Sequence, residues 1–326
     1  MPIIRNRKLF LAIGALIVLT AGVIVATFGL KPSIDFTGGT LTEVRYGTMP
    51  EKSAIEGVLA ESDLANGAIR ESSGEFGASY IVTTKTLTVE EQKDLGEKLT
   101  KLGSDASIIR TTSIGPVIGE EMKSKAYWAI GAVLIVTIIY VAFAFVGIGK
   151  PVSSWIYGSF TVLVLFHDIL VPIAVMSLLG YFWGLEVDVL FVTALLTILG
   201  YSVNDTIVIF DRVREKLVQN RIEHRKKIQE PGGIERDEVT YTITRPFADL
   251  VGEAVSDTMA RSINTSLTVL FALLALYFFG SAVTQTFALV LIAGVFAGAY
   301  SSIFIASPLL VAYAEWQAKR AVANPK

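Results

Sequence analysis

The sequence GYSVNDTIVIFDRVRE, residues 200–215, places polar side chains at the end of a long apolar segment. Asn204 and Asp205 come before Ile207–Phe210, so both lie at a depth where hydrocarbon would surround an isolated helix. Ionisable residues at that depth are costly and usually functional. A carboxyl group can bind and release a proton, so the pattern predicts proton binding at Asp205.

Polar residues recur on two predicted helices. In the first, they are Thr193, Thr197, Gly200, Tyr201, Asn204 and Asp205, mostly four residues apart. In the second, they are Arg261, Asn264, Thr265 and Thr268, at i, i+3, i+4 and i+7. Each set is expected to form one helix face that looks into a bundle. Asp205 and Arg261 can then meet across two helices.

The spacing leaves the role of this pair open. A movable Arg261 could tune proton binding at Asp205. Alternatively, the two residues could form a static ion pair that fixes helix packing, or an interfacial pair in contact with water. Asp257, one turn before Arg261, is a competing partner that could hold the arginine at the surface.

His167 and Asp168 interrupt another apolar segment, and Pro172 removes the helical donor for the Asp168 carbonyl. No third group or nucleophile spacing indicates a hydrolase, so the pair is interpreted as a polar bundle contact or an accessory proton site. Gly294, Gly298 and Ser302 predict a close helix-packing seam.

The elements that must position these residues are membrane helices. The chain has 326 residues, of which 52% are hydrophobic, which indicates a polytopic membrane protein. Crossing ~30 Å of hydrocarbon takes about 20 apolar residues. Six segments satisfy this requirement: 9–30, 126–146, 152–180, 187–210, 262–280 and 285–312.

Lys and Arg concentrate in residues 1–8, at Lys150, in 211–261 and in the tail 313–326, including Lys326. The positive-inside rule therefore places both termini in the cytoplasm. The first apolar segment exceeds the usual length of a signal-peptide core, which favours a retained helix. The balance of 28 basic and 30 acidic residues argues against nucleic-acid binding, and the absence of cysteine excludes disulfides, haem thiolates and zinc fingers.

Residues 31–125 form the large outer segment. Strands are predicted at 40–46, 68–71, 78–84 and 106–112, and helices at 51–59 and 89–102. This order, β-α-β-β-α-β, predicts a ferredoxin-like α+β domain. The motif DFTGGT, residues 35–40, lacks the Lys-Ser/Thr of a phosphate loop and predicts a tight turn into the first strand.

These motifs together resemble the SecF family, the smaller membrane subunits of the SecD/SecF protein-export complex in the proton-driven RND superfamily. The resemblance rests on DFTGGT, the His-Asp pair at 167–168, GYSVNDTIVIFDRVRE and RSINTSLT, residues 261–268. It covers essentially the whole chain, and it implies half of an RND-type bundle.

The resemblance implies a non-enzymatic role in which no cofactor is used and the proton-motive force drives transport. SecF-like proteins pair with SecD beside the SecYEG channel in the bacterial cytoplasmic membrane and help unfolded exported polypeptides to leave on the outer side. The family's proton-pathway carboxylate corresponds to Asp205 and its essential arginine to Arg261, while Asn204 and Thr206 belong to the same motif. Asn264, Thr265, Asp257, His167 and Asp168 are possible accessory residues.

Two departures from the family pattern bear on this interpretation. Residues 217–260 form a longer cytoplasmic segment with a Pro231-Gly232-Gly233 break, and SDTMA, residues 256–260, stands where the family commonly has Asn-Gln-Thr-Leu-Ser. The second departure leaves the local partner of Arg261 open. Two alternatives also remain: a proton-driven transporter of a lipid or small molecule, and a non-transporting scaffold for the translocase.

Overall fold

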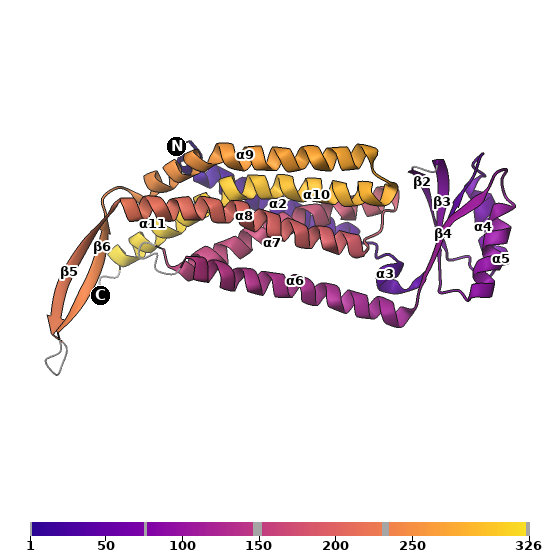
Figure 1. Ribbon diagram of the computed structural model, residues 1–326, viewed down its shortest axis with the longest axis horizontal. Helices are drawn as coiled ribbons and strands as arrows, with labels where there is room; N and C mark the ends of the chain where they lie inside the picture. Colours follow the sequence, from indigo (N-terminus) through magenta and orange to yellow (C-terminus); the bar gives the residue numbers. More distant parts are fainter. Residues whose placement is uncertain (1, 75–76, 146–151, 230–234, 324–326) are drawn as a thin grey trace.

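The computed structural model describes residues 2–74, 77–145, 152–229 and 235–323. Lys150, the predicted end of the second span at Val146, the Pro231-Gly232-Gly233 break and Lys326 lie outside the described residues. The chain forms a long helical bundle with an α+β domain at one end, and both termini lie at the opposite end (Figure 1).

Six helices are long and apolar enough to cross a membrane, which confirms the predicted number. The first five are α2 (Arg7–Phe28), α6 (Pro116–Ala144), α7 (Ser154–Trp183), α8 (Val189–Gln219) and α9 (Phe247–Phe279). The sixth span joins α10 (Ala282–Ser301), a π-helical segment (Ser302–Ala306) and α11 (Ser307–Ala323). The short helix α1 (Pro2–Arg5) precedes α2.

The helices extend beyond the boundaries that hydropathy predicts. Helix α6 begins at Pro116 rather than at 126, α8 continues to Gln219 rather than ending at 210, and α9 begins at Phe247 rather than at 262. Hydropathy detects only the apolar part of a helix, whereas the backbone hydrogen bonds of the helix continue into polar segments. Ion pairs such as Glu121 with Lys125 (2.8 Å) support these charged turns.

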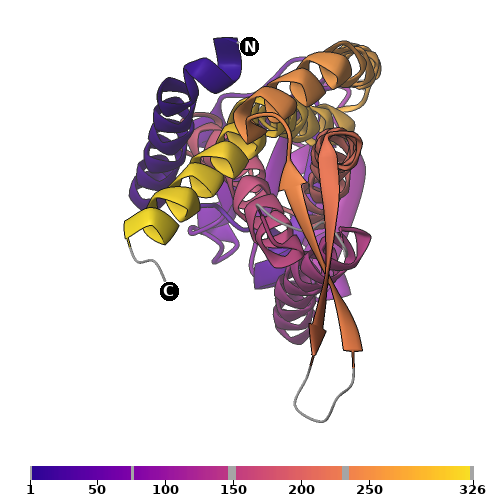
Figure 2. The ribbon, with the colours of Figure 1, turned by 90° about the vertical axis from the view of Figure 1, so that its left-hand side faces the viewer.

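The rest of the predicted cytoplasmic loop contains an antiparallel ribbon. Strands β5 (Arg221–Gln229) and β6 (Glu235–Ile243) pair from Arg221 with Ile243 to Gln229 with Glu235. Figure 2 shows the ribbon extending away from the bundle end. These strands were not predicted from the sequence.

The outer domain has the predicted ferredoxin-like order. It contains β1 (Gly39–Arg45), α4 (Lys52–Glu61), β2 (Ala68–Gly74), β3 (Gly77–Thr84), α5 (Val89–Thr100) and β4 (Ser107–Ile114). The antiparallel sheet has the order β2-β3-β1-β4. Helices α4 and α5 cover the face of the sheet away from the bundle (Figure 1), and Val44, Ile55, Leu59, Val82 and Leu95 form part of the core between them.

The DFTGGT motif attaches this domain to the bundle. Its first residues form the one-turn helix α3 (Ile34–Thr37), which precedes the predicted turn. Gly38 and Gly39 have φ angles of +71° and +139°, and a Cβ on Gly38 would lie 2.8 Å from Cα of Pro116. Only glycine allows both this backbone and this close approach to the start of α6.

The loop before α8 contacts the same motif. The backbone N–H of Val189 donates to Oδ2 of Asp35 at 3.0 Å. Pro32 and Val187 form a parallel bridge. The outer domain is therefore fixed to the outer ends of α6 and α8.

The predicted small-residue seam is confirmed. Helix α10 packs against α7, α8 and α9. A Cβ on Gly294 would lie 2.2 Å from Cδ1 of Ile198, and one on Gly298 would lie 3.2 Å from Cβ of Ser202. Because Gly294 and Gly298 have no side chains, α10 can closely approach α8, the helix that carries Asp205.

Gly294→Ala is expected to destabilise the bundle by about 1–3 kcal/mol, because the added methyl group overlaps the buried Ile198. Gly22→Ala is the matched control, since a Cβ on Gly22 meets nothing within 4 Å. Thermal unfolding of the purified protein in detergent measures both. Equal stability of the two variants would contradict the close approach of α10 to α8.

Candidate functional site

Asp205 lies inside the bundle, with only 3% of its surface exposed. Its Oδ2 accepts a long hydrogen bond of 3.5 Å from Oγ of Ser266 on α9. The hydroxyl of Tyr201 donates to the same Ser266 Oγ at 3.1 Å. Two neutral hydroxyl groups therefore connect α8 and α9 at the depth of this carboxyl group.

The structure does not bring Arg261 into contact with Asp205. Within the described part of the chain, the Arg261 side chain has no hydrogen bond or ion pair, and it is exposed. It lies five residues before Ser266, which is ~7.5 Å toward the N-terminal end of α9. There it lines a cavity of about 360 Å³ together with Asp211, Glu215 and Thr258.

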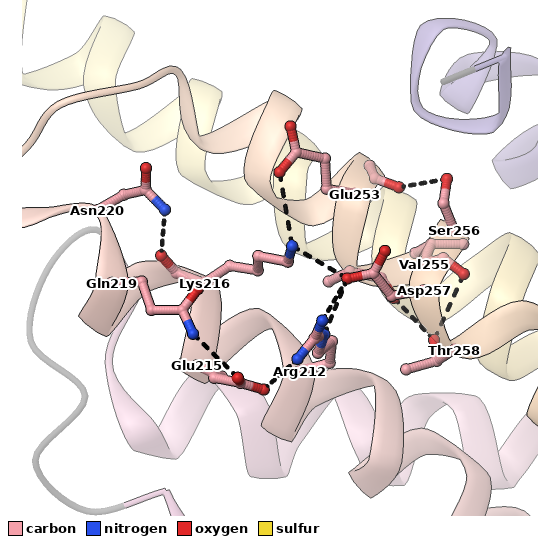
Figure 3. Close-up of polar contacts among 12 residues, drawn as sticks. Arg212, Glu215, Lys216, Gln219, Asn220, Glu253, Val255, Ser256, Asp257 and Thr258 are labelled. Atoms are coloured by element: carbon pink, nitrogen blue, oxygen red, sulfur yellow. Dashed lines mark hydrogen bonds and ion pairs between the residues drawn. The ribbon is translucent and has the colours of Figure 1, made fainter.

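Asp257 does not hold Arg261 either. Its Oδ2 accepts from Nε and Nη2 of Arg212 at 3.0 and 2.6 Å, and it pairs with Nζ of Lys216 at 3.0 Å. Figure 3 shows Asp257 of α9 facing these two cations of α8. The predicted competition for Arg261 is therefore wrong in this structure.

Further charged residues extend this set of ion pairs between α8 and α9. Arg212 Nη1 donates to Glu215 Oε2 at 2.5 Å, and Lys216 Nζ lies 3.8 Å from Glu253 Oε2 (Figure 3). Glu253 also binds Arg245. Arg245 precedes α9, and its pKa is raised because Glu253 bonds to its charged form. The helices are thus joined by charges at the end of the bundle that holds the termini and by hydroxyl groups at the depth of Asp205.

Much of the predicted polar surface faces away from the bundle. On α8, Thr193, Thr197, Gly200 and Asn204 are exposed, and on α9 so are Arg261, Asn264, Thr265 and Thr268. The prediction that these faces look into the bundle is therefore wrong within this chain. Because a helix has 3.6 residues per turn, three four-residue steps from Thr193 to Asp205 rotate the side chain by ~120°. Thr193 consequently points outward and Asp205 inward.

The buried face of α8 carries two further polar contacts. Thr206 Oγ1 lies 3.1 Å from Ser302 Oγ, at the start of the π-helical segment. Ser202 Oγ donates to Oδ2 of Asp168 on α7, and Asp168 Oδ1 lies 2.9 Å from Nδ1 of His167. The sequence motif did not reveal the contacts of Ser202, Ser266 and Ser302, because serine is common in ordinary helix packing.

A second cavity, of about 430 Å³, lies between the outer domain and the bundle. Charged residues from both parts line it: Asp35, Glu43, Arg70, Arg110, Glu186 and Asp188. Burial raises the pKa of Glu186 and Asp188 and lowers that of Arg70. In the part of the chain that the structure describes, no cluster of three or more His, Asp and Glu side chains could hold a metal ion.

Comparison with known proteins identifies relatives of the whole chain. The family described as protein export membrane protein SecD/SecF, C-terminal, matches residues 94–232 and 234–316, and the SecD/SecF GG motif matches residues 23–48. The protein translocase subunit SecF of Thermobaculum terrenum is 32% identical over 95% of this chain and 93% of its own length. SecF of Anaerolinea thermophila is 33% identical over 97% and 95%, respectively.

The chain also matches part of a longer relative. The protein translocase subunit SecDF of Thermus thermophilus is 34% identical over 90% of this chain, which covers 36% of the SecDF length. A crystal structure of SecDF from that organism, described as a translocon-associated membrane protein, superposes with a TM-score of 0.79 at 30% identity. It covers 97% of this chain, which spans 39% of the SecDF chain.

A double-mutant cycle tests the contact between α8 and the π-helical segment. For Thr206→Val and Ser302→Ala we expect a coupling free energy of about 0.6 kcal/mol, with an upper bound of about 1.7, as for hydrogen bonds between membrane helices. Unfolding in detergent–denaturant mixtures gives the four stabilities. The control cycle pairs Thr206→Val with Ser177→Ala, whose hydroxyl bonds to the Gly29 carbonyl, and should be additive. Additivity in the first cycle would refute the contact.

Proposed function

Because the chain belongs to the SecD/SecF family of protein-export membrane proteins, we propose that it uses the proton-motive force to promote protein translocation. In this role it acts as a SecF-type subunit with SecD and the SecYEG channel in the bacterial cytoplasmic membrane. The observation that carries the proposal is Asp205, a carboxyl group buried in the bundle with a hydroxyl as its hydrogen-bond partner.

Such a carboxyl group has two states of different charge. Ionised, it places a negative charge in a bundle where a cation would be attracted to it; protonated, it is neutral. Arg261 is not committed to another side chain in the described residues and borders a cavity, so it has room to change position. Each proton that crosses the membrane supplies about 2.3 kcal/mol per 100 mV.

Helix α8 offers a physical route from Asp205 to the outer domain. The helix is continuous from Val189 to Gln219. At its outer end, the Val189 N–H donates to the side chain of Asp35, which lies just before the first strand of the outer domain. A shift of α8 upon protonation would therefore move the attachment of that domain, which we propose acts on polypeptides that emerge from the channel.

The exposed polar faces of α8 and α9 support a membrane partner. Polar residues on a membrane helix usually face another helix or a water-filled cavity rather than lipid. The SecDF relative joins a matching segment to a longer chain. We assign SecD as the partner that covers these faces.

The proposed orientation follows from the positions of the termini. Both termini lie at the end of the bundle opposite the outer domain (Figure 1), together with Arg5, Arg7 and the Arg212 cluster. The positive-inside rule assigns this end to the cytoplasm. Residues 31–125 then lie on the outer side, where exported polypeptides emerge.

The alternatives make different use of the same features. A transporter of a lipid or small molecule requires a mostly apolar pocket, whereas the outer cavity is lined by six charged residues. A scaffold for the translocase requires the contacts of Asp205 but not its proton. The scaffold alternative is tested by comparing the export activity of variants at equal levels of assembled complex.

Asp205→Asn and Arg261→Ala are expected to reduce force-dependent export to the rate seen without the proton-motive force, because the site loses its exchangeable proton or its cation. Preprotein export into membrane vesicles measures this at matched levels of assembled complex. Asp249→Asn on α9 is the control, since its side chain is exposed and does not line the cavity that Arg261 borders. If Asp205→Asn kept the force-dependent rate, the scaffold role would replace the proposal.

A photoreactive amino acid at Asn264 or Asn204 is expected to crosslink to SecD, because both positions lie on the exposed polar faces. Leu19 on α2 is the control: it is 66% exposed but lies in an apolar stretch that suits lipid. Crosslinked products are identified by mass spectrometry of native membranes. Lipid adducts from all three positions, without SecD, would contradict this assignment.

A further inference from the structure

A second acid–base pair lies in the middle of the bundle, on α7. Asp168 is fully buried, and His167 is 2% exposed. The Asp168 carboxylate joins two groups, because it lies 2.9 Å from His167 Nδ1 and accepts a hydrogen bond from Ser202 of α8. Charged or polar groups at this depth are expensive unless they serve a function.

The other ring nitrogen of His167 is unsatisfied. Among the described residues, Nε2 has no hydrogen-bond partner although it is buried. When Nδ1–H donates to Asp168, Nε2 carries a lone pair that can accept a proton. A buried polar atom without a partner is uncommon in folded proteins and calls for a specific explanation.

Next to the pair, one backbone carbonyl lacks its usual helical donor. Pro172 lies inside α7, four residues after Asp168, and has no N–H to donate to the Asp168 carbonyl. Freed backbone carbonyls in membrane helices are commonly satisfied by side chains or ordered water. The Asp168 carbonyl, next to the pair, is therefore a place where a side chain or a water molecule would donate a hydrogen bond.

Other titratable groups lie on the helices packed against α7, mostly toward the helix ends. Helix α2 has none between Lys8 and its end at Phe28. On α6 they are Glu120, Glu121, Lys123 and Lys125 near its start, and the exposed Tyr127 and Tyr140. The remaining groups are Tyr201, Asp205, Asp211, Arg212, Arg214, Glu215 and Lys216 on α8, Tyr300 on α10, whose ring centroid lies 6.2 Å from that of His167, and Tyr313, Glu315, Lys319 and Arg320 on α11.

We propose that His167 and Asp168 form a second proton-binding site of the bundle, to which Ser202 of α8 is bonded. Hydronium transfers a proton to Nε2 of the neutral imidazole: the N–H bond forms as one O–H bond of hydronium breaks, and water is released. The pair changes from a net charge of −1 to a neutral imidazolium–carboxylate pair. The use of this site in transport rests on the proposed function, but proton binding itself does not.

The position of the site relates it to Asp205. Helix α8 runs from its outer end at Val189 toward the cytoplasm, and Ser202 precedes Asp205 by three residues, or ~4.5 Å along the axis. The second site is therefore bonded to α8 about one helical turn toward the outer side. Hydrogen bonds to ionised groups are stronger than neutral ones, so proton occupancy changes how Ser202 holds α8 against α7.

The chain has two histidines, His167 and His224, which allows a direct test. In the full-length His224→Gln protein, labelled with ¹⁵N-histidine and reconstituted in lipid, His167 gives the only imidazole signals. We expect the ¹⁵N shift of Nε2 to change from the lone-pair to the protonated value between about pH 4 and pH 9, a range that brackets the ordinary imidazole titration. A constant shift across this range in the folded protein would overturn the proposal.

Two variants test the role of the carboxylate. Asp168→Asn should move the transition to lower pH, because an adjacent carboxylate stabilises an imidazolium. Thr161→Val is the control, since the buried Thr161 hydroxyl bonds only to the Tyr157 carbonyl of its own helix. Equal transitions in Asp168→Asn and Thr161→Val would refute the pair as a unit. If Asp168→Asn does not fold, Ser202→Ala replaces it and must shift the transition relative to Thr161→Val.

This test is independent of the export assay. A titrating His167 together with force-dependent export that ignores Asp205 would preserve the second site and reject the proposed function. A constant ¹⁵N shift of His167 together with export that requires Asp205 would reject the second site and preserve the proposed function.

Discussion

Hydrocarbon offers no hydrogen-bond partner, so every polar group at membrane depth must be satisfied within the protein or by a second chain. In this bundle α8 is the helix on which that constraint acts most strongly. Three neighbouring positions on its buried face, Ser202, Asp205 and Thr206, contact α7, α9 and the π-helical segment, respectively. The close approach of α10 at Gly294 and Gly298 then holds the sixth span against the same helix. A change in the charge of Asp205 therefore occurs on a helix whose buried face is bonded to several others.

The same constraint explains why the chain is incomplete as a membrane unit. The exposed faces of α8 and α9 carry an arginine, two asparagines and several threonines at depths where lipid cannot bond to them. Threonine hydroxyls can bond to their own helix, as Thr197 does to the Thr193 carbonyl and Thr265 to the Arg261 carbonyl. In the described residues, the side chains of Asn204, Asn264 and Arg261 make no such hydrogen bond within their own helix. They need hydrogen-bond partners from another chain or from water. A second half-bundle provides this without any change in the fold of the first.

The sequence was sufficient for features that rest on a long or regular pattern. Six apolar segments predicted six spans, and alternating strands and helices in 31–125 predicted the ferredoxin-like domain. The sequence was insufficient where the geometry depends on the rotation of side chains around a helix axis or on which of several charged residues forms an ion pair. A four-residue period seemed to place Thr193 beside Asp205, although the helix turns them apart, and no pattern indicated that Asp257 would bind Arg212 and Lys216 instead of Arg261. The ribbon β5–β6 was missed because β5 consists mostly of charged residues without alternation, and β6 alternates apolar residues with threonine only over its last five residues, 239–243.

The magnitudes favour small movements of α8 rather than a reordering of the bundle. Hydrogen bonds between membrane helices contribute ~0.6 kcal/mol each on average, so the three polar contacts of α8 amount to ~2 kcal/mol together. One proton supplies about 2.3 kcal/mol per 100 mV, which is of the same order. The apolar contacts of α8, which include the buried Leu195, Ile198, Leu199, Ile209 and Phe210, amount to several times more. Under the proposed mechanism, protonation would exchange polar partners and shift α8 along its neighbours, while the apolar packing would keep α8 within the bundle and carry the shift to Val189, which contacts Asp35.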